Sequence, residues 1–376
     1  MRAILPPAML GILGGGQLGR MFVTAAKRMG YRVTVLDPDA NAPAADFADV
    51  HLCAPFDDAD ALKTLAASCA AVTTEFENVN ADAMRTLAKT TRVSPSGDCV
   101  AIAQDRIAEK SWINKAGLPT APYLAIESVE DIQVELAPYL PGILKTARLG
   151  YDGKGQVRVK TADEARAAYA NLGGQACVLE KMLELKLEVS AIVTRTSSAQ
   201  VAVFPVSENI HKNGILDESI VPARLAPELA ARVQQYAVKL AEALDYIGVL
   251  AVEFFVLGDD SLVVNEIAPR PHNSGHYTID ACVTDQYQQQ VRAMCGLLPG
   301  KTDLLSPVVM VNLLGDVWRE DGGEPLWDVL MEAPNAHLHL YGKKEARAGR
   351  KMGHFTVLAA NVDDALDQAR ALKDTL

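Results

Sequence analysis

The sequence predicts an α/β domain followed by mixed α+β structure, divided among three domains. Over residues 9–93, short apolar strands alternate with amphipathic helices, a pattern typical of a parallel sheet covered by helices. From about residue 142 to 265 strands dominate instead. The chain has 376 residues, and at roughly 100–200 residues per domain this length predicts two to four domains. We expect domains at 1–95, 96–298 and 299–376.

The first domain is expected to contain a Rossmann-like parallel sheet. Helical periodicity covers residues 17–29, where Gly30 ends the helix, and residues 58–67. The apolar strands between which these helices run are expected at 9–13, 32–36, 50–53 and 70–74.

The second domain begins after residues 94–97 (SPSG), a sequence typical of a linker. Helices are expected at about 98–116, 162–170 and 227–244. The strands are expected at 142–145, 156–160, 178–182, 188–193, 201–205 and, as a hairpin turning at 258–260, at 249–257 and 261–265. This order suits a mixed α+β domain. The small third domain should contain strands near 308–313 and 353–359 and a final helix near 363–373.

Composition and charge exclude several classes of protein. With 49% hydrophobic and 22% charged residues, the chain is globular and not disordered. A net charge of −11 argues against a nucleic-acid binder but leaves a small anionic substrate open, because local charge can oppose the average. The six cysteines form no CxxC pair, which indicates reduced thiols in a cytoplasmic protein. No apolar run approaches the roughly 18 residues that span a bilayer.

A glycine-rich turn, residues 14–19 (GGGQLG), follows the first strand and opens the first helix. It satisfies GxGxxG, and Asp37 ends the next strand 18 residues after Gly19. Taken alone, this fingerprint favours NAD or FAD. Another phosphate ligand and a purely structural turn are the alternatives.

A second glycine-rich loop, residues 148–156 (RLGYDGKGQ), lies between two expected strands, the first of which is closed by Lys145. Three glycines flanked by cations form a flap that could fold over a polyphosphate. The loop lacks the GxxxxGK[ST] spacing of a P-loop. The alternative is a surface hairpin.

A pair of carboxylates on the expected hairpin indicates a metal site. Glu253 lies within an apolar stretch, and Glu266 follows Asn265 at the end of the next strand. If the hairpin forms, both carboxylates can face one side, where they suit Mg²⁺. A solvated sheet edge is the alternative. The loop at 268–277 (APRPHNSGHY) has two prolines and many donors, which favours substrate recognition over structural polar packing.

Together these segments resemble the ATP-grasp family and, within it, the N5-carboxyaminoimidazole ribonucleotide synthetases. The resemblance rests on GILGGGQLGRM, TTEFENV, GYDGKGQ, NEIAPRPHNSGHYT and GRKMGH, and it covers essentially the whole chain. It implies a three-domain enzyme with a Rossmann-like first domain, a two-lobed central ATP-grasp domain and a small C-terminal domain. The implied reaction carboxylates 5-aminoimidazole ribonucleotide with ATP and bicarbonate, through carboxyphosphate, in purine biosynthesis. The glycine turn at 14–19 then lies at the entrance for the ribonucleotide and binds no dinucleotide.

The resemblance also implies an ATP site between the two central lobes. Hinge residues would contact adenine largely through main-chain groups, Glu188 would accept hydrogen bonds from the ribose, and the flap would cover the phosphates. Two Mg²⁺ ions would be held by Glu253 and Glu266. The implied ATP-binding set is Arg106, Lys145, Gly150, Tyr151, Asp152, Gly153, Lys154, Gly155, Gln156, Glu180, Lys181, Met182, Leu183, Glu188, His211, Asn265 and Glu266.

Catalytic and substrate-binding residues follow from the same resemblance. Arg270 would hold bicarbonate or the γ-phosphate, Lys154 would add a cation, and Asp152 or His276 would assist proton transfer. Residues 342–351 contain five cationic side chains, although the protein as a whole is acidic. This cluster favours a binding site for a phosphate monoester over the alternative of a solvated basic turn. The implied ribonucleotide site contains Gln17, Leu18, Glu75, Asn273, Lys343, Arg350 and Lys351.

Other activities remain as alternatives. A formate-using relative that acts on glycinamide ribonucleotide would share the fold and the ATP site, but the GGGQLGRM and NSGHYT segments favour the carboxylating enzyme. The chain is short for a biotin carboxylase. A nicotinamide oxidoreductase rests only on residues 14–19 and Asp37, and a non-catalytic ATP-binding regulator would tolerate loss of a metal carboxylate. The family further implies a homodimer that hands its product to the downstream mutase, with no nucleic-acid or membrane partner.

Overall fold

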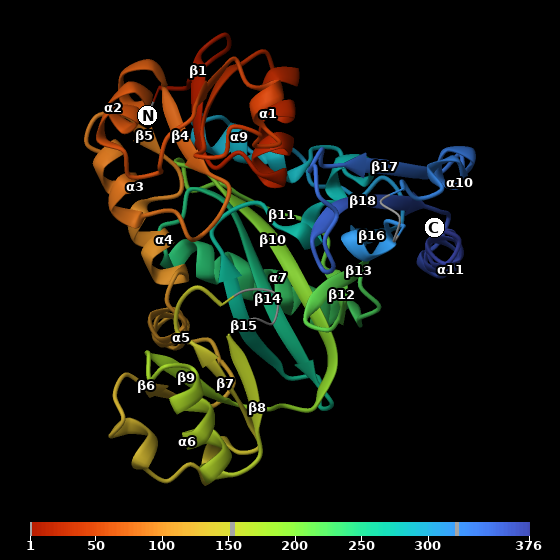
Figure 1. Cartoon of the computed structure of the whole chain (residues 1–376). Helices are drawn as coiled ribbons and strands as arrows, with labels where there is room; N and C mark the ends of the chain where they lie inside the picture. Colours follow the sequence, from red (N-terminus) through yellow and green to blue (C-terminus); the bar gives the residue numbers. More distant parts are fainter. Residues whose placement is uncertain (1, 151–154, 320–322) are drawn as a thin grey trace.

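The N-terminal region folds around a five-stranded parallel sheet (Figure 1). The computed structural model describes residues 2–150, 155–319 and 323–376. All four strand pairs are parallel, as the alternation of strands and helices predicts. The strand order is β3-β2-β1-β4-β5, with β1 Met9–Leu13, β2 Arg32–Leu36, β3 Val50–Leu52, β4 Ala71–Thr74 and β5 Arg92–Val93.

Helices cover both faces of this sheet. The apolar side of α1 (Gln17–Arg28) packs on one face together with α9 (Gln286–Met294), which comes from much later in the chain. On the other face, α2 (Ala59–Ser68) and α3 (Ala81–Leu87) complete a second core. Tyr287, Val291 and Met294 of α9 are buried against α1 and β1, so the first and second domains share a core.

The expected linker and the long helix after it are both wrong. Ser94, Pro95 and Gly97 are buried, although Ser96 is exposed, and the Ser94 hydroxyl donates to the carbonyl of Ile247 at 2.7 Å, so most of this segment packs against the rest of the protein. The helix expected over 98–116 is two helices, α4 (Gly97–Ala103) and α5 (Arg106–Lys115). The break has a local cause, because the Asp105 carboxylate caps α5 by accepting from the main-chain N–H groups of Ile107 and Ala108.

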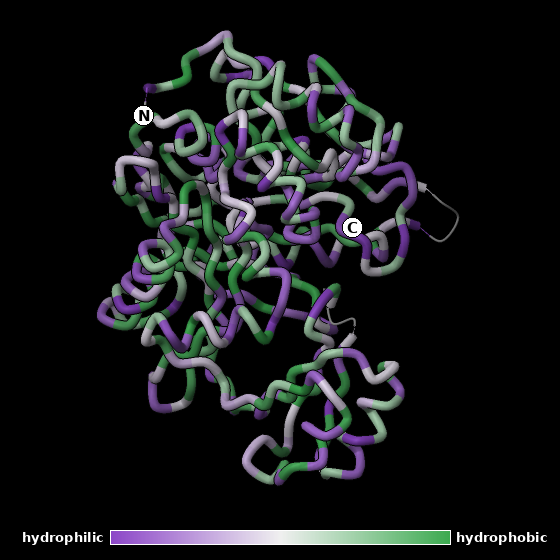
Figure 2. Tube along the Cα trace, turned by 90° about the vertical axis from the view of Figure 1, so that its left-hand side faces the viewer, coloured by the Kyte–Doolittle hydropathy of each residue, from purple (hydrophilic) through white to green (hydrophobic). Residues whose placement is uncertain are grey.

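The second region contains a small lobe built on a four-stranded antiparallel sheet, at the bottom of the molecule in Figures 1 and 2. Its strand order is β6-β9-β7-β8, and α6 (Ala162–Asn171) packs against it. The strands are β6 Tyr123–Ile126, β7 Gly142–Thr146, β8 Gln156–Val159 and β9 Cys177–Lys181.

A large antiparallel sheet joins the rest of the second region to the third. Eight of its strands follow in the order β15-β14-β10-β12-β13-β16-β18-β17, and β11 (Val201–Val203) pairs with β10 beside them. The strands before and after the expected domain boundary at residue 298 therefore belong to one continuous sheet. The limits of all three domains stay predictions. The eight strands are β10 Leu185–Arg195, β12 Ser207–Lys212, β13 Ile215–Val221, β14 Gly248–Leu257, β15 Leu262–Ala268, β16 Val308–Leu314, β17 Ala336–Leu340 and β18 Lys351–Leu358.

Two long helices cover parts of this sheet. The buried side chains of α7 (Pro227–Ala243) recur at helical spacing and pack on β10 and β14. In the C-terminal region, α11 (Val362–Lys373) packs on β16 and β18, while the short helix α10 (Trp327–Glu332) adds to the same core. Within the described parts of the chain, no helix combines the length and the apolar character needed to cross a membrane.

Candidate active site

A cavity of about 620 Å³ lies between the small lobe and the large sheet. Twelve of the seventeen residues expected to bind ATP line it, and they come from both sheets, from α5 and from the loops after β7 and β9. Tyr151, Asp152, Gly153 and Lys154 lie outside the described residues, and Gly155 is described but does not line the cavity. The twelve that line the cavity are Arg106, Lys145, Gly150, Gln156, Glu180, Lys181, Met182, Leu183, Glu188, His211, Asn265 and Glu266.

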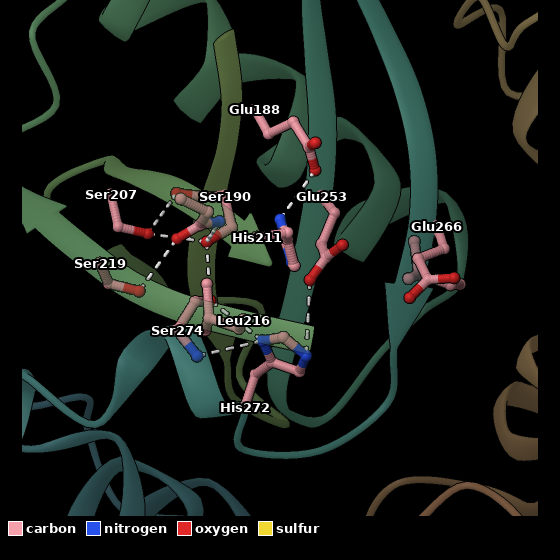
Figure 3. Close-up of polar contacts among 12 residues, drawn as sticks. Glu188, Ser190, Ser207, His211, Leu216, Ser219, Glu253, Glu266, His272 and Ser274 are labelled. Carbon is pink, nitrogen blue, oxygen red and sulfur yellow. Dashed lines mark hydrogen bonds and ion pairs between the residues drawn. The ribbon is translucent and has the colours of Figure 1, made fainter. Parts of the chain in front are cut away.

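The two expected metal carboxylates stand directly opposite each other on the hairpin of β14 and β15. The strand register pairs Glu253 with Glu266 and Phe254 with Val264, which leaves Asn265 as the extra residue of a β-bulge. The expectation that the carboxylates lie side by side is therefore confirmed. In Figure 3 both extend from the same side of the hairpin.

The electrostatics of this pair suit a bound cation. Burial, and then the neighbouring Glu266 carboxylate, raise the pKa of Glu253 to about 7. Burial acts in the same direction on Glu266, but Arg106, whose Nη1 lies 2.9 Å from Oε2, keeps the pKa of that carboxyl below its usual range. The described residues contain no group of three or more His, Cys, Asp or Glu placed to hold a metal. A pair of carboxylates fits Mg²⁺, which usually takes its remaining ligands from phosphate oxygens and water.

At the opposite side of the cavity, one buried carboxylate holds two lysines. Glu180 accepts from Lys145 at 3.0 Å, and Lys110 lies 3.2 Å from its other oxygen. Burial alone would raise the pKa of Glu180, but these two cations hold it at about 2. The sequence predicts that this hinge contacts adenine mainly through main-chain groups, but it does not predict that the Glu180 side chain pairs with Lys145 and Lys110. Lys110 was also missed, although it stands four residues after Arg106 on the same helix face.

A second ion pair lies on β10 and β12. His211 Nδ1 is 2.9 Å from Glu188 Oε2 (Figure 3). Burial opposes a charged imidazole, but the Glu188 carboxylate raises the pKa of His211 above its ordinary value. Both side chains line the cavity beside Glu253.

The loop at 268–277 places Arg270 and His272 at the cavity wall. The Arg270 Nε donates to Glu77 at 2.5 Å, which links the loop to the N-terminal domain. Burial alone would raise the pKa of Glu77, but Arg270 lowers it to about 2. Glu77 was not predicted to line the cavity, although it belongs to the TTEFENV segment. Burial, and then Arg270, lower the pKa of His272 to about 3, so its ring is neutral.

His276 lies elsewhere. It is fully buried between Tyr287 and His354, and it is not among the described residues that line the cavity. Burial lowers its pKa well below the ordinary value. This placement argues against the direct role in proton transfer that we expected.

The glycine turn at 14–19 holds carboxylates of the protein itself. Glu75 accepts from the main-chain N–H groups of Gly16 at 2.5 Å and Gly19 at 2.6 Å, and Asp37 accepts from Gly15 at 2.7 Å. A Cβ at Gly14, whose φ is +100°, would lie 2.3 Å from the Glu75 side chain. The protein thus fills the position that a dinucleotide phosphate would take. The role of Glu75 in binding the ribose stays a prediction, because a carboxylate that accepts two hydrogen bonds can accept others.

Only some of the residues expected to bind the ribonucleotide lie close to one another. Lys343 donates to the Gln17 side chain at 2.5 Å and to the carbonyl of Lys351 at 2.6 Å, so the N-terminal turn meets the C-terminal region. Asn273 and Lys351 line the cavity. Arg350 instead donates to the carbonyl of Glu345 at 2.8 Å. The described residues lining the cavity do not include Gln17, Leu18, Glu75, Lys343 or Arg350.

Three family models match consecutive parts of the chain. They describe a ribonucleotide synthetase preATP-grasp domain over residues 8–104, an ATP-grasp domain over 111–287 and a phosphoribosylaminoimidazole carboxylase C-terminal domain over 308–368. The N5-carboxyaminoimidazole ribonucleotide synthase of Bacillus subtilis (strain 168) is 43% identical over 366 residues, which are 97% of this chain and 95% of that protein. The chain belongs to the N5-carboxyaminoimidazole ribonucleotide synthase family.

Other members of the synthase family agree over a similar length. The synthase of Brucella melitensis biotype 1 is 47% identical over 357 residues, or 94% of this chain and 97% of that protein. A crystal structure described as the ADP complex of an N5-carboxyaminoimidazole ribonucleotide synthetase superposes with a TM-score of 0.92, at 44% identity, over 99% of this chain and 98% of that one. The Aspergillus clavatus synthase in complex with ADP and 5-aminoimidazole ribonucleotide gives 0.89, at 32% identity, over 98% of each chain. The expected three-domain ATP-grasp fold is confirmed.

Proposed function

We propose that this protein catalyses the ATP-dependent carboxylation of 5-aminoimidazole ribonucleotide by bicarbonate. The products are N5-carboxyaminoimidazole ribonucleotide, ADP and phosphate, with carboxyphosphate as the intermediate, in purine biosynthesis. The observation that carries the proposal is that the carboxylate pair of β14 and β15 shares one cavity with Arg106, Lys145 and Arg270. Its relatives carry the name of this reaction product, and one of them binds both ADP and 5-aminoimidazole ribonucleotide.

The cations of the cavity would hold the polyphosphate in this reaction. Lys145 and Lys110 share the single carboxylate of Glu180, so this group carries a net positive charge. Arg106 extends from the N-terminal turn of α5 toward Glu266. Mg²⁺ bound by Glu253 and Glu266 would supply charge neutralisation to the transferring phosphoryl group.

Arg270 is our candidate for holding bicarbonate or the γ-phosphate. Glu77 fixes its guanidinium at the cavity wall, and the pairing allows a buried cation to face an anionic substrate. Because His276 does not line the cavity, Asp152 remains our candidate for proton transfer. For the ribonucleotide, the contact between Gln17 and Lys343 supports a site formed jointly by the first and third domains.

We further propose a cytoplasmic homodimer that passes its product to the downstream mutase. Six free thiols support a reducing compartment. The dimer and the hand-over rest on the family resemblance.

Phosphate release should require both 5-aminoimidazole ribonucleotide and bicarbonate. We expect purified protein with Mg²⁺ and ATP to release phosphate when both substrates are present, and at a much lower rate when either is omitted. Glycinamide ribonucleotide with formate serves as the matched control for the formate-using relatives. Stimulation by that pair, and not by 5-aminoimidazole ribonucleotide, would refute the proposed function.

The ion pair of Glu77 and Arg270 should make stability depend on pH. The folded-state pKa of Glu77, about 2, lies below its ordinary value of 4.5, so the pair contributes fully above about pH 4.5 and loses its contribution as pH falls toward 2. At pH 7 we expect Glu77→Gln to lower the free energy of unfolding by about 1.5–3 kcal/mol, the contribution of a hydrogen bond to a charged group. Urea midpoints of both proteins between pH 3 and 7 should converge as pH falls. The exposed control Glu127→Gln should give a small difference that does not vary with pH, and a constant gap for Glu77→Gln would contradict the assignment.

A further inference from the structure

A row of polar side chains crosses four neighbouring strands of the large sheet at the metal site. The registers pair Ser207 with Ser190 and Ser190 with Glu253, and Glu253 is paired with Glu266 on the next strand. The two serines are buried with no more than 1% of their surface exposed. A buried hydroxyl costs free energy unless it is hydrogen-bonded, so these two serines need hydrogen-bond partners within the protein.

The hydroxyl of Ser190 is the centre of a connected network (Figure 3). It receives a hydrogen bond from the Asn209 amide nitrogen at 3.0 Å and donates to the Ser274 hydroxyl at 2.7 Å. The amide oxygen of Asn209 accepts from Ser219 at 3.0 Å. Ser274 in turn lies 2.9 Å from Nδ1 of His272.

The hydrogen bonds of this network are all donated in one direction, from Asn209 through Ser190 and Ser274 to His272. An amide NH₂ can only donate, so Asn209 does not take the Ser190 proton, and the geometry of the contact with Ser274 makes Ser190 its donor. With that proton used, the Ser207 hydroxyl at 2.7 Å must donate to Ser190. Ser274 then uses its own proton on His272 Nδ1, which also receives the main-chain N–H of Ser274 at 3.3 Å. Two donors aimed at Nδ1 exclude a proton there. The ring proton of His272 therefore lies on Nε2, which faces Glu253 Oε1 at 3.5 Å.

We propose that Asn209, Ser190 and Ser274 are positioning residues that fix His272 as its Nε2–H tautomer, with that N–H directed at the Glu253 carboxylate. The inference deepens the proposed function, because it rests on Glu253 as a ligand of Mg²⁺. An N–H held against one carboxylate oxygen orients the carboxylate before the cation arrives. Such outer partners commonly contribute 10–100-fold to metal affinity or activity.

The tautomer can be measured directly, without metal or substrates. We would record ¹⁵N spectra of the metal-free protein labelled in its histidine rings, and assign His272 by the signals that are lost in His272→Gln. The wild-type protein should show an unprotonated Nδ1 and a protonated Nε2. Ser274→Ala and Ser190→Ala, which cut the line at two different links, should each give a mixture of the two tautomers.

Ser207→Ala is the matched control. It removes a hydroxyl that is equally buried and is 2.7 Å from Ser190, but that does not lie between Asn209 and His272. It should keep the wild-type tautomer. In activity assays, Ser274→Ala should raise the Mg²⁺ concentration for half-maximal rate by about 10-fold, whereas Ser207→Ala should leave it unchanged.

The outcomes separate this inference from the proposed function. A wild-type Nδ1–H tautomer would overturn the inference, as would Ser274→Ala or Ser190→Ala proteins that fold and keep a single Nε2–H form. If circular dichroism shows that Ser274→Ala does not fold, the tautomer of His272 in Ser190→Ala tests the inference. A tautomer shift confined to these two variants supports the inference even if the wild-type protein carboxylates no ribonucleotide, a result that would reject only the proposed function.

Discussion

Glu266→Gln is expected to abolish turnover and to leave the protein folded. The substitution keeps the shape of the side chain but removes one of the two negative charges that we propose as Mg²⁺ ligands. Charge stabilisation by a bound metal contributes several kcal/mol to phosphoryl transfer, so the rate should fall by at least about a hundredfold. The fold should persist because the loss of the ion pair with Arg106 is offset in part by the loss of the repulsion between Glu266 and Glu253.

This expectation is tested by phosphate release and by thermal unfolding of the same preparation. Asp259→Asn, at the exposed turn of the same hairpin, removes an equal charge away from the cavity and should retain the wild-type rate. A Glu266→Gln protein with normal turnover would refute the metal assignment.

Glu180→Gln is expected to weaken both stability and activity. Glu180 is buried with Lys145 and Lys110, and the loss of its charge leaves two cations without their shared counter-ion. Removing one partner of a buried ion pair typically lowers the free energy of unfolding by about 3–5 kcal/mol. Because Lys145 lines the cavity, we also expect a higher KM for ATP, with a much smaller change in the KM for the ribonucleotide.

Urea unfolding and steady-state kinetics measure these two effects. Glu184→Gln is a matched control, since it changes an exposed glutamate only four residues away and should alter stability by less than about 0.5 kcal/mol. If Glu180→Gln proved as stable as Glu184→Gln, the lysines would not depend on this carboxylate.

Much of the fold could be predicted because it depends on short-range patterns. The hairpin of β14 and β15 and its turn were predicted, since the turn residues are close in sequence, whereas the bulge at Asn265 that sets the register was not. The break between α4 and α5 was missed, because Gln104 and Asp105 are both compatible with a helix and only the cap formed by Asp105 reveals the boundary. The pairing of Val221 with Val308, which joins β13 to β16, links distant residues and leaves no local signal.

The candidate site also contains contacts between residues that are distant in sequence, which local patterns do not predict. Residues 14–19 have every local feature of a dinucleotide loop, and the ligand that fills the loop, Glu75, follows more than 50 residues later. Family resemblance corrected the choice of ligand, and the folded chain shows the Glu75 carboxylate at the main-chain N–H groups that a dinucleotide phosphate would use. Similarly, the main chain and the side chain of Glu180 have different partners. Its main chain belongs to the hinge strand β9, whereas its carboxylate contacts Lys110 of α5 and Lys145 of β7.

The continuous sheet from β15 to β17 has a consequence for how the enzyme can move. Glu266 stands on its first strand, and Lys351 begins the strand next to its last, so both belong to one hydrogen-bonded plate. A hydrogen-bonded sheet resists stretching, and the spacing between the metal carboxylates and the C-terminal cations should stay constant through the catalytic cycle. Opening and closing would then be confined to the small lobe, which could admit and release nucleotide while the acceptor side of the reaction keeps its alignment.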